Sequence, residues 1–262
     1  MHVADLSDIA LNYRIDGPKD GPPVVFVNSL GTDYRLWDQL LPLLPEGLRF
    51  IRYDKRGHGL SECPTPPYSM GALVTDLERL LDHLDIRDAV IVGCSIGGLI
   101  AQGLAVKRLD QVRAMVLSNT GAKIGTHQMW ADRIAAVEKD GIEALAEATM
   151  GRWFSKDFHT TPELKAWRAM LVRTPAAGYV GCSHAIAGTD FYTTTASLTL
   201  PTLAIAGSED GSTPPDLVRE TGALVKGSRF ELIRGAGHLP MVEKPEQFAE
   251  ILTTFLKDIG HI

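Results

Sequence analysis

Hydrophobic positions change their spacing several times along the chain, and these changes predict where strands and helices alternate. Short alternating segments at residues 4–6 and 10–15 predict a hairpin at the edge of a sheet. Four apolar, β-rich runs follow, at residues 24–27, 50–53, 89–92 and 114–117. Segments with helical spacing separate these runs, at residues 36–44, 70–84 and 99–107. The alternation predicts an α/β fold, with a mostly parallel central sheet flanked by helices.

The alternation of strands and helices stops between about residues 120 and 200. Helix-like stretches rich in Ala, Glu, Arg and Trp occupy this part, among them MWADRIAAVEKD and ELKAWRAMLVR. Strand-like runs resume at residues 202–206 and 229–233, and helices are predicted from Pro214 and over residues 245–256. We therefore expect one core, formed by residues 1–120 and 199–262, with residues 121–198 inserted as a helical cap after the sixth strand.

Charge and composition exclude some classes of protein without naming an activity. The formal net charge of −6 argues against nucleic acid or a membrane surface as partner, because both attract a basic face. The uncharged run at residues 89–106 approaches the length of a membrane span, but its glycines favour a strand, a turn and a helix. Three cysteines, Cys63, Cys94 and Cys182, lack paired spacing, and the first residues lack a signal-peptide pattern. We expect free thiols and a cytoplasmic location.

A candidate nucleophile lies where a predicted strand meets a predicted helix. The pattern Gly93-x-Ser95-x-Gly97 directly follows the run at residues 89–92 and precedes a helix-like segment. In this context G-x-S-x-G predicts a sharp turn that lifts the serine hydroxyl above the sheet edge. The helix N-terminus at the turn favours developing negative charge. Cys94 is expected to point into the fold as a small buried hydrophobe.

A serine nucleophile needs a base within hydrogen-bond reach, and His238 is the leading candidate. It lies in the loop GAGHLP after the last predicted strand, at the same expected edge of the sheet. His58 and His184 could approach a site, but neither follows the last strand. Asp210 is the expected acid that orients His238, with the adjacent Glu209 as its rival. The chain order Ser, Asp, His is the one expected of the α/β-hydrolase fold.

Acyl transfer through a serine also needs donors for the oxyanion of the tetrahedral intermediate. The backbone N–H of Ile96, directly after the nucleophile, is one candidate. The other is the backbone N–H of Leu30, in the loop NSLG after an inner strand. A simple connecting loop is the alternative for Leu30, because backbone donors leave little trace in a sequence. This chemistry requires no metal and no cofactor.

Motifs spread over nearly the whole chain can be compared with known families. They are NSLGTD with Trp37-Asp38, YDKRGHGLS, the turn GCSIGG, GSEDGSTPP, GAGHLP, and residues 126–134 of the expected cap. Together they resemble the 3-oxoadipate enol-lactonases of the α/β-hydrolase superfamily, and NSLGTD is the most discriminating of them. The resemblance implies hydrolysis of 3-oxoadipate enol-lactone to 3-oxoadipate through an acyl-enzyme, in the β-ketoadipate pathway of aromatic breakdown.

An anionic lactone in a chain of net negative charge requires a fixed cation. Arg133 is the first candidate; the alternatives are Arg152, Arg168 and Arg173, and each could instead be a solvated helix charge. Trp130 and Trp153 are expected to wall the pocket, although aromatic residues on amphipathic helices also serve plain packing. Other readings remain open: a carboxylesterase, a carbon–carbon bond hydrolase, a cofactor-free perhydrolase, or a ligand receptor on the hydrolase fold. Oligomeric state cannot be read from the sequence.

Overall fold

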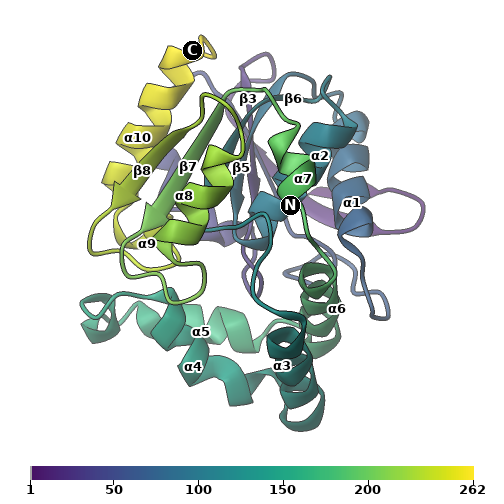
Figure 1. Cartoon of the computed structure of the whole chain (residues 1–262). Helices are drawn as coiled ribbons and strands as arrows, with labels where there is room; N and C mark the ends of the chain where they lie inside the picture. Colours follow the sequence, from purple (N-terminus) through teal and green to yellow (C-terminus); the bar gives the residue numbers. More distant parts are fainter. Residues whose placement is uncertain (1) are drawn as a thin grey trace.

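The computed structural model describes residues 2–262 and contains one sheet with helices on both faces (Figure 1). The eight strands lie in the order β1-β2-β4-β3-β5-β6-β7-β8. Their bounds are β1 (His2–Asp5), β2 (Ala10–Asp16), β3 (Pro23–Val27), β4 (Arg49–Tyr53), β5 (Ala89–Cys94), β6 (Val112–Ser118), β7 (Thr202–Gly207) and β8 (Arg229–Ile233). The pairs β1–β2 and β2–β4 are antiparallel, and the other neighbours are parallel. The predicted α/β architecture and its edge hairpin are confirmed.

With one exception, at residues 36–44, the predicted helices are present in the predicted order. The helices are α1 (Met70–His83), α2 (Ile96–Lys107), α3 (His127–Asp140), α4 (Ala146–Trp153), α5 (Leu164–Val172), α6 (Ala176–Ala187), α7 (Tyr192–Ala196), α8 (Pro215–Ala223), α9 (Pro240–Glu243) and α10 (Pro245–Asp258). Helix α2 packs on β5 and β6 and α8 packs on β7, whereas α10 packs against β8. No helix within residues 2–262 is both long and apolar enough to cross a membrane.

The predicted helix over residues 36–44 is wrong. The structure has two 3-10 turns there, η1 (Tyr34–Trp37) and η2 (Leu41–Leu43). Pro42 lies within the second turn, and in a continuous α-helix it would lose a backbone hydrogen bond and clash with the preceding turn. The apolar spacing is still used, because Leu36, Trp37 and Leu40 are buried.

The uncharged run at residues 89–106 is a strand, a turn and a helix, as predicted. Every residue of β5 is buried, and α2 is buried over most of its surface. A central parallel strand is covered by helices on both faces, which explains why it carries no polar positions. The junction between β5 and α2 therefore lies at the centre of the sheet.

The segment between β6 and β7 is helical and contains α3, α4, α5, α6 and α7, with the short turns η3 (Ile142–Leu145) and η4 (Phe158–Thr160). Thr126 caps the N-terminus of α3, and its side chain accepts a hydrogen bond from the Met129 N–H. Figure 1 shows α3 to α6 lying together below the sheet, across the ends at which β7 and β8 terminate. Loops from several strands thus meet the helical segment at one edge.

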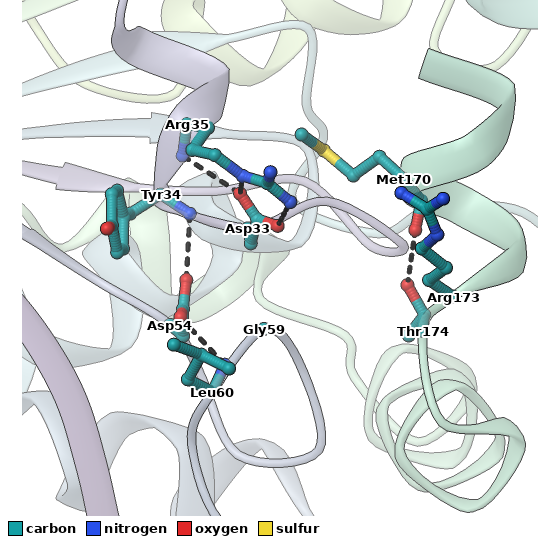
Figure 2. Close-up of a pocket in the computed structure, with 9 residues that line it drawn as sticks. All are labelled: Asp33, Tyr34, Arg35, Asp54, Gly59, Leu60, Met170, Arg173 and Thr174. Atoms are coloured by element: carbon teal, nitrogen blue, oxygen red, sulfur yellow. Dashed lines mark hydrogen bonds and ion pairs between the residues drawn. The ribbon is translucent and has the colours of Figure 1, made fainter. Parts of the chain in front are cut away.

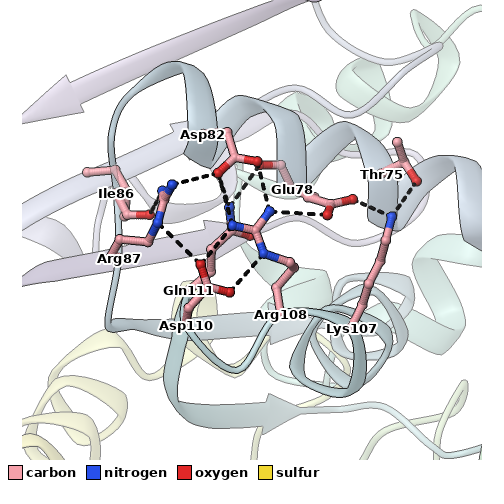
Figure 3. Close-up of polar contacts among 9 residues, drawn as sticks. All are labelled: Thr75, Glu78, Asp82, Ile86, Arg87, Lys107, Arg108, Asp110 and Gln111. Atoms are coloured by element: carbon pink, nitrogen blue, oxygen red, sulfur yellow. Dashed lines mark hydrogen bonds and ion pairs between the residues drawn. The ribbon is translucent and has the colours of Figure 1, made fainter.

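A network of ion pairs joins α1 to the end of α2 (Figure 3). Arg108 lies at its centre and bonds Asp82 at 2.8 Å, Asp110 at 2.7 Å and Glu78 at 3.2 Å. The hydrogen bond from Arg108 lowers the pKa of Asp82. Because these charges pair with one another on a largely exposed surface, we assign the network a structural role only.

Candidate active site

Ser95 occupies the sharp turn between β5 and α2. Its backbone has φ 58° and ψ −119°, a conformation that residues other than glycine seldom adopt. A Cβ atom on Gly93 would lie 2.3 Å from the Gly97 carbonyl oxygen, and one on Gly97 would lie 2.1 Å from the Val27 carbonyl oxygen. The two glycines therefore allow the strand, the turn and the helix to approach closely enough to present the serine.

His238 and Asp210 meet at the carboxyl ends of β8 and β7. The His238 Nδ1 atom lies 2.9 Å from Asp210 Oδ2. The same oxygen accepts hydrogen bonds from Asn119 Nδ2 at 2.9 Å and Thr213 Oγ1 at 2.7 Å. The other oxygen, Oδ1, accepts from the backbone N–H groups of Ser212 and Thr213, at 2.7 and 3.0 Å.

These contacts decide the charge of Asp210 and the tautomer of His238. Burial tends to raise the pKa of Asp210, but the charge of His238 and the hydrogen bonds from His238, Asn119 and Thr213 lower it below its ordinary value. A charged carboxylate only accepts hydrogen bonds, so the proton of neutral His238 lies on Nδ1 and Nε2 is the basic atom. The rival Glu209 is exposed, and its carboxylate accepts from the Lys156 N–H instead.

Ser95 and His238 line one cavity between the sheet edge and the helical segment. Core residues Ser29, Leu30 and Thr213 share its wall with Trp130, Arg133, Arg152, Trp153 and Tyr179 from the inserted helices. Ser29 Oγ lies 3.4 Å from His238 Nε2, so a second hydroxyl also faces the base. Nucleophile and base candidates from distant segments therefore face the same space.

Both predicted oxyanion donors are free to donate. Within residues 2–262, the backbone N–H groups of Leu30 and Ile96 donate no hydrogen bond to the protein. Leu30 lines the cavity, and Ile96 is the first residue of α2, where an N–H has no partner inside the helix.

Two arginines of the inserted helices line the cavity. The Arg133 guanidinium lies 4.7 Å from the ring centre of Trp130, and Arg152 Nη2 donates to Thr149 Oγ1 at 3.0 Å. Neither forms an ion pair with a carboxylate in the described part of the chain. Burial and the charge of Arg133 lower the pKa of Arg152. Unpaired guanidinium groups of this kind favour an anionic ligand.

The other two candidate arginines lie outside this cavity. Arg168 forms ion pairs with Glu147 at 2.7 Å and Glu143 at 3.1 Å. Arg173 lines a second cavity, which Figure 2 shows together with Arg35 and its ion pair to Asp33. This second cavity measures about 330 Å³ against about 80 Å³ beside Ser95. It contains no serine or histidine, so we place the candidate site in the smaller cavity, where those groups converge.

The two candidate tryptophans wall the cavity and are both buried. Trp130 Nε1 donates to the Ile124 carbonyl at 2.6 Å, which fixes the plane of its ring. The Trp153 carbonyl accepts from the His238 N–H at 2.7 Å, so α4 also holds the loop of the base. No pattern in the sequence indicates that backbone contact.

The rival histidines do not line the cavity with Ser95. His58 is buried, its Nε2 accepts from the Gly31 N–H at 3.0 Å, and burial together with the charge of Lys55 holds its pKa well below the ordinary value. His184 is exposed. Cys94 is buried as expected, and burial raises the pKa of its thiol. Within residues 2–262, no group of three or more His, Cys, Asp or Glu side chains could hold a metal ion.

The chain resembles known hydrolases in sequence and in fold. The profile of the Alpha/beta hydrolase family matches residues 24–251. The chain belongs to this family. The hydrolase is 35% identical to 3-oxoadipate enol-lactonase 2 and 36% identical to 3-oxoadipate enol-lactonase 1 of Acinetobacter baylyi, each over 95% of this chain and 94% of the relative. The crystal structure of the enol-lactonase from Burkholderia xenovorans LB400 matches with a TM-score of 0.94 at 34% identity, covering 98% of this chain and 100% of that chain. The resemblance that the motifs indicated is confirmed.

Sequence reasoning missed two side chains that form hydrogen bonds with the candidate acid Asp210. One is Thr213, which directly precedes the helix predicted from Pro214 and whose hydroxyl donates to Asp210 Oδ2 at 2.7 Å. Asn119 follows β6 with φ 48°, a conformation in which asparagine is enriched. A polar residue directly after a buried strand was the available signal for Asn119.

Proposed function

We propose that this hydrolase opens 3-oxoadipate enol-lactone with water to give 3-oxoadipate, as a step of aromatic breakdown in the β-ketoadipate pathway. The observation that carries the proposal is one cavity lined by Ser95, His238 and two arginines without carboxylate partners. The similarity to proteins named enol-lactonases, at 34–36% identity, supports the same substrate.

In this mechanism Ser95 Oγ attacks the lactone carbonyl carbon while His238 Nε2 takes the hydroxyl proton. The backbone N–H groups of Leu30 and Ile96 stabilise the oxyanion, and Asp210 stabilises the imidazolium. When the ring C–O bond breaks, His238 returns the proton to the leaving enol oxygen, and the enol tautomerises to the ketone. An enol leaves more readily than an alkoxide, so modest acid assistance is enough.

Water then releases the acyl-enzyme. The water oxygen attacks the ester carbon while His238 Nε2 takes a proton from the water. His238 then donates this proton to Ser95 Oγ when the bond between the acyl carbon and Oγ breaks. The side-chain carboxylate of the substrate binds both Arg133 and Arg152 throughout. Trp130 and Trp153 limit the access of bulk water to the reacting atoms.

A direct assay tests the proposal: turnover of 3-oxoadipate enol-lactone by the parent protein, Ser95→Ala and Ser29→Ala. We expect Ser95→Ala to lower kcat by about 10⁴- to 10⁶-fold. Ser29→Ala is the matched control, because Ser29 lines the same cavity and its hydroxyl also faces His238. It should retain most of the activity.

Three outcomes would contradict the proposal in different ways. Turnover of simple esters without turnover of the enol-lactone would indicate a different esterase. Loss of activity in Ser29→Ala but not in Ser95→Ala would show that the nucleophile is wrong. Ligand binding by the parent without any turnover would indicate a receptor on the hydrolase fold.

A further inference from the structure

Lys55 is a buried cation behind the loop that carries Leu30. It lies two residues after the end of β4, and only 1% of the residue is exposed. Its Nζ atom donates to the Ser29 carbonyl at 2.7 Å and to the Thr32 carbonyl at 3.3 Å. Within residues 2–262, no carboxylate lies within ion-pair distance of this ammonium group. A buried ammonium without a carboxylate is costly, so packing alone does not explain it.

The hydrogen bond from Lys55 determines where the next N–H points. In a trans peptide the C=O and N–H bonds point in opposite directions, and the Ser29–Leu30 bond is trans. Because the Ser29 carbonyl points toward Lys55, the Leu30 N–H of the same peptide points away from it. Leu30 lines the cavity of Ser95, and its N–H donates to no protein group in the described chain.

The following peptide is fixed as well. The Gly31 N–H donates to His58 Nε2 at 3.0 Å, and Gly31 has φ +77°, which a side chain would strain. His58 cannot turn freely, because it is buried and its Nδ1 lies 3.2 Å from the Arg56 carbonyl. Two consecutive peptide planes of the loop are therefore held by buried side chains of one segment, residues 55–58.

The Ser29 carbonyl does not need Lys55 as a hydrogen-bond partner. It also accepts from Thr32 Oγ1 at 2.9 Å and from the Thr32 N–H at 3.3 Å. Removing the ammonium would leave this carbonyl satisfied. Lys55 adds a positive charge beside the carbonyl oxygen of the Ser29–Leu30 peptide, whose N–H faces the cavity.

We propose that Lys55 is a positioning residue for the oxyanion hole, whose ammonium orients and polarises the Ser29–Leu30 peptide so that its N–H donates to the developing oxyanion. The inference rests on the proposed serine mechanism. It assigns Lys55 no contact with substrate. A cation at the carbonyl strengthens the N–H of the same peptide as a donor, and that donor acts on the transition state more than on the bound substrate.

The test compares Lys55→Met, which keeps the length and burial of the side chain, with the parent protein. Lys107→Met is the matched control, because Lys107 lies on the exposed network at the end of α2 (Figure 3). Both variants are assayed with the enol-lactone and with the neutral ester p-nitrophenyl acetate. We expect Lys55→Met to lower kcat/KM about 10- to 100-fold for both substrates, mainly through kcat, and Lys107→Met to match the parent.

Two binding measurements separate positioning from general damage. Phenylboronic acid forms a tetrahedral adduct on a reactive serine, with an oxygen in the place of the oxyanion. Its inhibition constant should rise by the same factor as kcat/KM falls in Lys55→Met, whereas the dissociation constant of 3-oxoadipate should stay within about twofold. An unchanged boronic acid constant, or activity within about threefold of the parent, would overturn the proposal.

A second variant covers the case in which Lys55→Met does not fold. Lys55→Gln keeps a donor and removes the charge, and we expect a smaller loss with the same parallel rise in the boronic acid constant. If both variants lose the native circular dichroism spectrum, Lys55 supports the fold as a whole and the proposal is wrong. If the parent cleaves the ester but not the enol-lactone, the proposed substrate fails while the ester data still test Lys55.

Discussion

Replacing Asp210 with Asn tests whether the buried carboxylate sets the tautomer of His238. Oδ1 accepts two backbone N–H groups, from Ser212 and Thr213, so the carbonyl oxygen of an asparagine would take that place. Its NH₂ group would then face the three donors that now bond Oδ2, which are Asn119, Thr213 and His238.

The Thr213 hydroxyl can rotate and accept, but the imidazole can respond only by changing tautomer. Its Nδ1 would accept from the new amide, and its proton would move to Nε2. Nε2 could then no longer take the proton of Ser95. A wrong tautomer with intact geometry lowers kcat by about 10⁴-fold, which corresponds to about 5.5 kcal/mol of lost transition-state stabilisation.

The assay measures kcat for the enol-lactone and for p-nitrophenyl acetate, together with ¹⁵N NMR of the labelled His238 ring. We expect the proton on Nδ1 in the parent and on Nε2 in Asp210→Asn. Glu209→Gln is the control, since Glu209 is adjacent but exposed, and it should match the parent. The reasoning is refuted if Asp210→Asn stays within tenfold of the parent, if Nδ1 keeps its proton, or if Glu209→Gln loses as much activity.

Two further predictions concern buried or confined cations. Arg133→Gln and Arg152→Gln should each raise KM for the anionic lactone about 10- to 100-fold, because a charge-assisted hydrogen bond is lost. The KM for the neutral ester should stay nearly the same. The control Arg168→Gln should change neither KM, and equal effects on the two substrates would contradict the assignment. Burial lowers the pKa of Lys55 from 10.5 to about 8. Between these two pH values Lys55 is protonated in the unfolded chain but deprotonated in the folded chain. The free energy of unfolding, measured in urea, should therefore rise relative to Lys55→Met by on the order of 3 kcal/mol over this range, and a constant difference would exclude the shift. Five groups interact with Lys55, and each remains in both proteins but loses its interaction with the Lys55 charge in Lys55→Met: Asp33, Asp54, His58, Cys94 and Cys182.

The sequence predicted the parts of this protein that depend on neighbouring residues. The run before Ser95 is apolar because β5 is buried on both faces, and the glycines around the serine are needed where strand and helix cross. Burial of a strand and close packing at a turn both restrict residues that are neighbours in the chain. They therefore produce a pattern that can be recognised in the sequence. The helix expected at residues 36–44 is absent for a local reason too. Pro42 interrupts this segment, although its apolar positions have helical spacing.

Contacts between distant segments could not be predicted in the same way. Asn119 reaches Asp210 across 91 positions of the chain, and Lys55 reaches Ser29 across 26. Each is an ordinary polar residue in its own segment. Its role arises only when the parallel strands bring their carboxyl ends together, which is a property of the sheet order rather than of any motif.

The pair of arginines shows how a chain of net negative charge could bind the anionic lactone that we propose as substrate. A chain with net charge −6 repels an anion at long range, but Arg133 and Arg152 place two positive charges in one partly buried cavity. Burial, followed by repulsion from the charge of Arg133, lowers the pKa of Arg152. A carboxylate bound beside them offsets that repulsion as well as gaining its own attraction. Affinity for an anion therefore depends on two side chains of the inserted helices, and substitutions there should change substrate choice while the serine, histidine and aspartate remain as they are.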